Sequence, residues 1–151
     1  MARAPMQILV LPYRRGTARA WEFAVFHRAD QDVWQFVAGG AEEGESPEAA
    51  AQREVCEEAG VPRSFPLRRL DSFASIPRSA LPQGAHWPDT VRVVPEYAFA
   101  VDVGPVPLAL SGEHRDLRWL DYEGALRLLH WDSNRTALWE LNERLGQEDR
   151  P

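Results

Sequence analysis

The amino-acid sequence predicts a mixed α/β sandwich formed by a single domain, residues 1–151. Three observations predict this fold class. Strand-like stretches are interleaved with a few helical stretches, which is the pattern of a layered α/β domain. The length of 151 residues suits one domain. The composition is 44% hydrophobic and 26% charged, so the chain can bury a substantial core.

Three strands are predicted in the first part of the chain. Residues 6–13 are largely apolar and lead into a glycine turn, and residues 21–27 alternate well enough for a half-buried second strand. Residues 34–37 form a short third strand that runs into Gly39 and Gly40. A glycine-rich loop therefore follows this third strand.

A helix is predicted over residues 47–59. Ser46 can cap its start, Pro47 suits the first helical position, and Glu48 favours the positive end of the helix dipole. Gly60 is a typical residue at the end of a helix. The segment therefore has clear signals at both ends.

The remainder of the chain continues the same alternation of strands and helices. In chain order we expect a strand at 67–76, a loop rich in proline and glycine at 77–89, a strand at 91–103, a strand at 117–120, a helix from its cap Asp121 through His130, and a helix from Ser133 or Asn134 to about Leu145. The strand at 91–103 carries the strongest β signal. The loop is too short to be a domain linker, and its role is left open.

The net charge of −6 is concentrated in residues 42–58, which hold seven glutamates and one arginine. Outside this segment the 16 acidic and 16 basic residues cancel. A protein that binds nucleic acid needs a basic surface, so the charge pattern argues against such a partner. Divalent cations would relieve the repulsion among these carboxylates, and solvation on an exposed helix face is the simpler alternative.

The sequence favours a cytoplasmic protein. The longest aliphatic run is residues 8–11, far below the roughly 20 apolar residues of a membrane-spanning helix. The first residues lack the apolar segment of a secretory signal. The lone cysteine, Cys56, excludes an internal disulfide and fits a reducing compartment. We expect no membrane partner and either a monomer or a homodimer.

Three glutamates share one face of the predicted helix. Glu54, Glu57 and Glu58 fall within an arc of roughly 100°. Arg53 precedes Glu57 by four residues and can orient its carboxylate. Carboxylates clustered without histidine or cysteine select Mg²⁺ or Mn²⁺ rather than zinc. Such ions, held beside an open glycine-rich loop, can promote attack on a phosphorus atom.

The segment 39–61 resembles the Nudix box. That motif is a glycine, five residues, a glutamate, seven residues, Arg-Glu, an aliphatic residue, any residue, Glu-Glu, any residue, a glycine and an aliphatic residue. The matching positions are Gly39, Glu45, Arg53, Glu54, Val55, Glu57, Glu58, Gly60 and Val61. The match contains no gap, so the chain resembles the Nudix hydrolases.

This resemblance implies an α/β/α sandwich around a mixed β-sheet, and hydrolysis of a diphosphate in a phosphorylated small molecule. It implies Mg²⁺ as the cofactor, with Mn²⁺ able to substitute. The implied metal ligands are Glu54, Glu57, Glu58 and the backbone carbonyl of Gly39. The implied catalytic residues are Arg53, Glu54 and Glu57, and the implied structural residues are Glu45 and Gly60. The resemblance leaves the identity of the general base open.

Short segments outside the motif resemble the bacterial dihydroneopterin triphosphate pyrophosphatases, a branch of the Nudix superfamily. They are Arg28, the pair Trp34-Gln35, Glu113 ahead of the strand ending in Trp-Leu, and Asn134 within a late Ser-Asn-Arg. This resemblance implies that Glu113 joins the metal site. It also implies that Arg28 grips a phosphate and that Trp34 stacks on a planar ring, with Gln35 and Asn134 as hydrogen-bonding partners. From the residues alone, surface solvation and core packing are the simpler interpretations.

Three functions stay open at this point. The first is a Mg²⁺-dependent pyrophosphohydrolase that acts on dihydroneopterin triphosphate or a similar small triphosphate. The second is a hydrolase of dinucleoside polyphosphates or modified nucleotides. The third is a non-catalytic ligand sensor, against which the intact glutamates argue. His86 and Trp87, in the loop at 77–89, either clamp a base or form a packed corner.

Overall fold

The structure is a computed structural model that describes residues 2–81, 84 and 86–151. Residue 1 of the predicted domain and residues 82, 83 and 85 of the predicted loop 77–89 lie outside the described residues. The elements in chain order are β1 (Arg3–Arg15), β2 (Trp21–Arg28), β3 (Trp34–Gln35), β4 (Val37–Glu42), α1 (Pro47–Ala59), β5 (Arg68–Pro77), η1 (Arg78–Ala80), β6 (Val93–Asp102), β7 (His114–Leu120), α2 (Tyr122–Leu128) and α3 (Asp132–Glu148).

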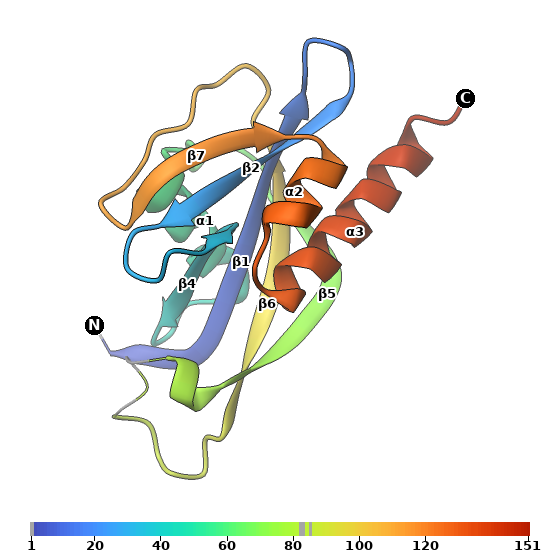
Figure 1. The fold of residues 1–151 in the computed structure, drawn as a ribbon. Helices are drawn as coiled ribbons and strands as arrows, with labels where there is room; N and C mark the ends of the chain where they lie inside the picture. The colour runs from blue at the N-terminus through green and yellow to red at the C-terminus, as the bar shows by residue number, and fades with distance from the viewer. Residues whose placement is uncertain (1, 82–83, 85) are drawn as a thin grey trace.

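Seven strands form one mixed sheet (Figure 1). Its main order is β3-β2-β1-β6-β5, with β4 pairing with β1 and β7 pairing with β2. Strands β1 and β6 run parallel, and the other pairs are antiparallel. The long strand β1 therefore lies at the centre, between β6 on one side and β2 and β4 on the other.

Helices cover both faces of the sheet (Figure 1). On β1, Ile8 and Val10 pack in a core with the apolar side chains of α1, whereas Leu9 and Leu11 pack in a second core with α2 and α3. This alternation follows from the period of two in a β-strand, which sends successive side chains to opposite faces. The predicted α/β/α sandwich is confirmed.

Helix α1 has the boundaries that the sequence predicts. The hydroxyl of Ser46 accepts a hydrogen bond from the backbone N–H of Ala49 at 3.1 Å, and Pro47 occupies the first turn. Gly60 has a φ of 73°, in the left-handed region, and its N–H donates to the carbonyl of Cys56 at 3.0 Å. A side chain at that position would be strained, which explains the glycine.

Several strand predictions need correction, since β1 spans Arg3–Arg15 rather than 6–13 and β6 spans Val93–Asp102 rather than 91–103. The predicted strand 34–37 is two strands, β3 and β4, separated at Phe36. The N–H of Phe36 donates to Oδ1 of Asn134 in α3 at 2.8 Å, so this donor is satisfied by a side chain outside the sheet. Strand β7 begins at His114 rather than at residue 117, because its pairing with β2 extends to Arg28.

Three helix boundaries also differ from the prediction, one of them the end of α3, which is Glu148 rather than about Leu145. Helix α2 ends at Leu128 rather than at His130, because Leu129 bridges to Trp34 and the N–H of His130 donates to the carbonyl of Trp34 at 3.1 Å. Helix α3 begins at Asp132 rather than at residue 133 or 134. Across the described part of the chain, the helices are too short or too polar to cross a membrane.

The described residues of the loop 77–89 show a packed corner at Trp87. This indole is buried, and its Nε1 donates to the carbonyl of Arg3 at 2.7 Å. The guanidinium of Arg78 donates to the carbonyl of Trp87 at 2.6 Å. His86 is exposed. Of the two interpretations of this loop, the contacts of Trp87 therefore favour structural packing.

Candidate active site

A cleft of about 1290 Å³ opens on the face of the sheet that carries α3. Strands β1, β4, β5 and β6 and the first turn of α3 contribute to its lining. Six residues that the sequence predicts for the site line it: Arg28, Gln35, Gly39, Glu54, Glu113 and Asn134. Segments far apart in the sequence therefore meet in one cavity, which is large enough to hold a small molecule.

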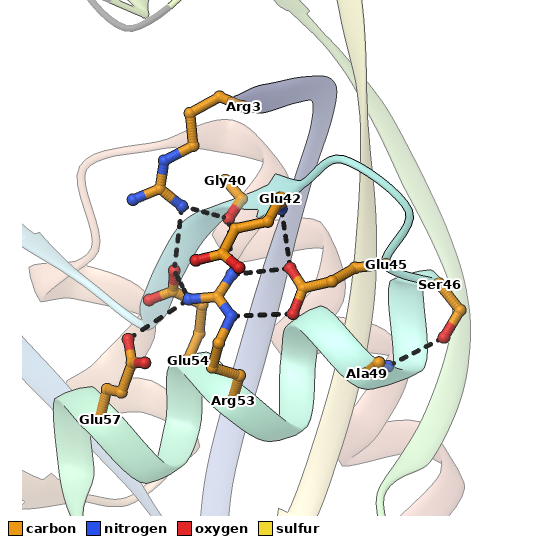
Figure 2. Close-up of polar contacts among 9 residues, drawn as sticks. All are labelled: Arg3, Gly40, Glu42, Glu45, Ser46, Ala49, Arg53, Glu54 and Glu57. Atoms are coloured by element: carbon orange, nitrogen blue, oxygen red, sulfur yellow. Dashed lines mark hydrogen bonds and ion pairs between the residues drawn. The ribbon is translucent and has the colours of Figure 1, made fainter. Parts of the chain in front are cut away.

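Arg53 is the centre of the polar contacts between α1 and the loop that precedes it (Figure 2). Its guanidinium donates to both carboxylate oxygens of Glu45, at 2.8 and 2.9 Å. It also donates to the carbonyl of Gly40 at 3.0 Å, to Glu54 at 3.0 Å and to Glu57 at 3.3 Å. One nearly buried arginine thus fixes three carboxylates and a backbone carbonyl.

These contacts determine the charge state of the loop. The hydrogen bond from Arg53 is the main reason that the pKa of Glu45 lies below its usual value. Glu45 also accepts a hydrogen bond from the N–H of Glu42 at 2.7 Å. The same pairing raises the pKa of Arg53, so this ion pair is charged at neutral pH. Glu45 therefore serves as the link between loop and helix that the sequence predicts.

Glu54 reaches from α1 to the floor of the cleft. It is 6% exposed, and burial is the main cause that raises the pKa of Glu54 to about 7. A Cβ placed on Gly39 would lie 2.3 Å from Cδ of Glu54, so only glycine leaves room for this carboxylate. The requirement for glycine at position 39 is therefore steric, because a side chain there would collide with Glu54 beside β4.

Glu58 lies one helical turn further along α1 and is also buried. Its Oε2 accepts a hydrogen bond from the hydroxyl of Ser111 at 2.6 Å and lies 3.5 Å from Nδ1 of His114. Burial raises the pKa of Glu58, the Ser111 hydroxyl opposes this rise, and the charge of Glu113 adds to it. The N–H of Glu113 donates to the same Ser111 hydroxyl at 3.3 Å, so this hydroxyl links the backbone of Glu113 to Glu58 on α1.

Arg28 and Glu113 meet at the mouth of the cleft. The N–H of Ala29 donates to the carbonyl of Glu113 at 2.9 Å, which joins the end of β2 to the start of β7. Arg28 forms an ion pair with Asp30 at 2.6 Å. This pairing is the main cause of the raised pKa of Arg28, and the charges of Glu113 and Glu58 contribute. A cation and the predicted metal ligand Glu113 therefore both line the cleft.

Two other residues predicted for the site, Glu57 and Trp34, do not line the cleft. The side chain of Glu57 is 52% exposed and contacts Arg53 outside the cleft lining. Trp34 is also absent from that lining, since its ring stacks on His27 with centroids 4.9 Å apart and lies under the guanidinium of Arg118. Stacking of Trp34 on a substrate stays a prediction.

Gln35 and Asn134 line the cleft but already hold parts of the fold together. Oε1 of Gln35 accepts a hydrogen bond from the indole of Trp131 at 2.9 Å, and Asn134 binds the backbone of Phe36. Both side chains are buried. They therefore fix the wall of the cleft at the start of α3.

Several residues in or beside the cleft were not predicted from the sequence. Ser111 and His114 contact Glu58, Arg3 donates to the carbonyl of Gly40 at 2.9 Å, and Gln7 and Glu96 lie on the cleft floor. Ser111 and His114 flank Glu113, so their position beside a predicted ligand is a usable signal. Gln7 and Glu96 belong to no motif and meet only through strand pairing.

The carboxylates of this site fit a hard divalent cation. Within the described parts of the chain, no three Asp, Glu, His or Cys side chains already converge as metal ligands. Glu54 is held by Arg53, and Glu58 by Ser111. Burial disfavours the charged forms of both glutamates, and a cation would offset this cost. Oxygen ligands without thiolates match the preference of Mg²⁺.

Comparison with known proteins agrees with this site. The family model described as the NUDIX domain matches residues 7–140. A solved structure of a NUDIX hydrolase from Listeria monocytogenes is 47% identical, covers 97% of this chain and 97% of that chain, and has a TM-score of 0.85. The motif, the fold and this similarity all indicate a Nudix domain.

Two curated relatives differ in how much of their length this chain spans. Dihydroneopterin triphosphate diphosphatase from Escherichia coli is 30% identical over 138 residues, which are 90% of this chain and 91% of that protein. An octanoyltransferase from Myxococcus xanthus is 38% identical over 106 residues, which are 70% of this chain. The chain spans only 27% of the length of that octanoyltransferase.

Proposed function

This chain belongs to the NUDIX family and is a Nudix hydrolase, and from that premise we propose that it is a Mg²⁺-dependent pyrophosphohydrolase of a small heterocyclic triphosphate, dihydroneopterin triphosphate above all. The observation that carries the proposal is the pair of buried carboxylates on α1, Glu54 and Glu58, of which Glu54 lines the cleft together with Glu113. The name of the Escherichia coli relative supports the choice of substrate.

We assign the metal to the end of the cleft that Gly39, Glu54 and Glu113 line, which we call the carboxylate end. Glu54, Glu57, Glu58, Glu113 and the carbonyl of Gly39 would hold Mg²⁺. When bound, this ion neutralises phosphate charge and lowers the pKa of water, which makes water a better nucleophile. The ion pairs of Arg53 support the assignment, because they fix the carboxylates in place before the substrate arrives.

The protein side chains have separate tasks in this proposal. Glu54 or Glu57 accepts the proton of the attacking water, and Arg53 orients both carboxylates. Arg28, next to Glu113, binds a phosphate of the substrate through its guanidinium. Gln35 and Asn134 form the wall against which the heterocycle rests. The pyrophosphate and the monophosphate then leave as separate products.

A panel of substrates with product analysis tests this function. We expect dihydroneopterin triphosphate with Mg²⁺ to yield pyrophosphate and a monophosphate in equal amounts. Cleavage of a dinucleoside polyphosphate into two nucleotides, without pyrophosphate from any triphosphate, would instead support the second function. Absence of hydrolysis across the panel would contradict both. Glu143→Gln is a suitable control, because Glu143 is an exposed carboxylate on α3 that does not line the cleft.

A further inference from the structure

Four register partners cross the floor of the cleft from β4 to β5. Gly40 pairs with Gln7, Gln7 pairs with Glu96, and Ala74 pairs with Glu96. All four line the cleft. Because residues in register project from the same face of a sheet, two polar side chains stand next to each other here, with a glycine and an alanine at their sides. These small neighbours leave the space above Gln7 and Glu96 open.

Gln7 and Glu96 are both buried, and among the described residues the amide nitrogen of Gln7 lacks a hydrogen-bond partner, whereas Glu96 interacts with the Ser133 side chain. Gln7 is 6% exposed, and in residues 2–81, 84 and 86–151 its Nε2 has no hydrogen-bond partner. Glu96 is 8% exposed. Burial raises the pKa of Glu96, and the Ser133 side chain opposes this rise in part. A buried donor is normally paired, so Nε2 of Gln7, unpaired among the described residues and next to the buried carboxylate of Glu96, points to a ligand that completes the site.

The surroundings of this pair suit a flat ring. The next row on the same face consists of Ala38, Leu9 and Ala98, which are apolar and line the cleft. Gly40, at the other end of the polar row, accepts hydrogen bonds from Arg53 and Arg3 at the carboxylate end. The distance from β4 to β6 is two strand spacings, about 10 Å. A ring over Gln7 and Glu96 can therefore direct its phosphate chain toward the carboxylates.

We propose that Gln7 and Glu96 select a substrate head group that carries a 2-amino-4-oxopyrimidine ring, the ring that pterins share with guanine. The two oxygens of Glu96 accept the ring N–H and one N–H of the amino group, and Nε2 of Gln7 donates to the ring carbonyl. This inference rests on the proposed function and deepens it by naming the chemical class that the cleft recognises. Adenine presents a ring nitrogen acceptor to Glu96 and is disfavoured.

Nucleoside triphosphates that differ in single groups test the proposal. We expect kcat/KM for GTP to exceed that for ITP, which lacks the amino group, by roughly tenfold or more, and ATP to be poorer still. Glu96→Gln should bring the ratio of GTP to ITP close to one. Gln7→Met should lower kcat/KM for both substrates and leave their ratio unchanged, because both carry the ring carbonyl. Dihydroneopterin triphosphate distinguishes a pterin preference from a guanine preference.

Binding without turnover separates this proposal from the proposed function. Dissociation constants of guanosine and inosine monophosphates are measured in chelator, with Glu143→Gln as the control and thermal midpoints to verify folding. Tighter binding of the guanosine compound, lost in Glu96→Gln, supports the subsite even when no triphosphate is hydrolysed. Equal binding of the two monophosphates, or no detectable binding of either, overturns it. Hydrolysis of triphosphates without head-group preference overturns the subsite and leaves the proposed function standing.

Discussion

The carboxylate end of the cleft and its head-group end, formed by Gln7 and Glu96, differ in how the chain assembles them. Glu45, Arg53 and Glu54 come from one loop and the helix that follows it, and they are already joined by hydrogen bonds. Gln7 and Glu96 come from strands far apart in the sequence and meet through the parallel pairing of β1 and β6. A local segment thus supplies the charged end, whereas strand register supplies the head-group end.

The two ends also differ in how well their polar groups are satisfied. Arg53 lowers the pKa of Glu45 through hydrogen bonds, while burial raises the pKa of Glu96. At the carboxylate end the ion pair of Glu45 and Arg53 therefore stabilises the fold, although burial raises the pKa of Glu54 and of Glu58. The head-group end holds polar groups at a cost in stability, which is the pattern expected of a surface that waits for a ligand.

Glu58→Gln should have the largest effect, because it removes a charge from the carboxylate end and keeps the shape of the side chain. We expect turnover to fall on the order of 100-fold or more, since cation-assisted catalysis depends on several kcal/mol. The amide oxygen can still accept the hydrogen bond from Ser111, so the thermal midpoint should hold. Steady-state rates with Glu143→Gln as the control test this. A wild-type rate at saturating Mg²⁺ would exclude Glu58 as a ligand.

Glu113→Gln tests whether the carboxylate end extends beyond α1. Turnover should fall by about tenfold, because one of several carboxylates is lost from the metal site. The thermal midpoint should stay the same or rise, since the charge of Glu113 disfavours the ionised form of Glu58. An unchanged rate would make Glu113 a solvated residue of the loop and restrict the metal site to the motif.

The loop contact of Glu45 predicts a pH-dependent stability. Its pKa in the folded state lies below the usual 4.5, so its stabilising effect is complete above that value and disappears as the pH falls through the folded-state pKa. Glu45→Gln should lower the free energy of unfolding by about 1–2 kcal/mol at pH 7. Urea unfolding should show this deficit shrinking below about pH 4.5. A deficit that does not vary with pH would contradict the ion-pair explanation.

Glu96 should show a pH dependence of stability with the opposite sign. Its folded-state pKa lies above the usual 4.5, so its ionisation costs stability as the pH rises from about that value through the folded-state pKa. Glu96→Gln should therefore raise the thermal midpoint at pH 8 and leave it nearly unchanged at pH 4. The same scans on Glu143→Gln provide the baseline. A lower thermal midpoint for Glu96→Gln than for the wild-type protein at pH 8 would contradict this prediction, because the ionised carboxylate would then stabilise the folded state.

The helix that carries the carboxylate end could be predicted from the sequence, because the spacing of its glutamates depends only on neighbouring residues. Ser46 and Gly60 mark the ends of α1, and the helical period places Glu54 and Glu58 one turn apart. The strands were predicted from their alternation, with errors of a few residues where side chains such as Asn134 intervene. Glu113 required a resemblance to known enzymes, because nothing in its neighbourhood indicates contact with α1.

The head-group end could not be predicted from the sequence, since the proximity of Gln7 and Glu96 depends on which strands pair and in which register. Gln7 in an apolar strand looks like an isolated polar residue, and Glu96 looks like an exception in the strongest strand of the chain. Only the parallel pairing of β1 with β6 places them side by side. Likewise, the packing of Trp34 against His27 follows from the pairing of β2 with β3.

The dependence of pyrophosphate release on Mg²⁺ tests the central claim most directly. Dihydroneopterin triphosphate is incubated with the wild-type protein while Mg²⁺ is titrated from excess chelator to saturation, and pyrophosphate is quantified. We predict no release in chelator, a rise to a plateau with Mg²⁺, and a comparable plateau for Glu143→Gln. Full pyrophosphate release in excess chelator would contradict the assignment of the buried glutamates to a metal site.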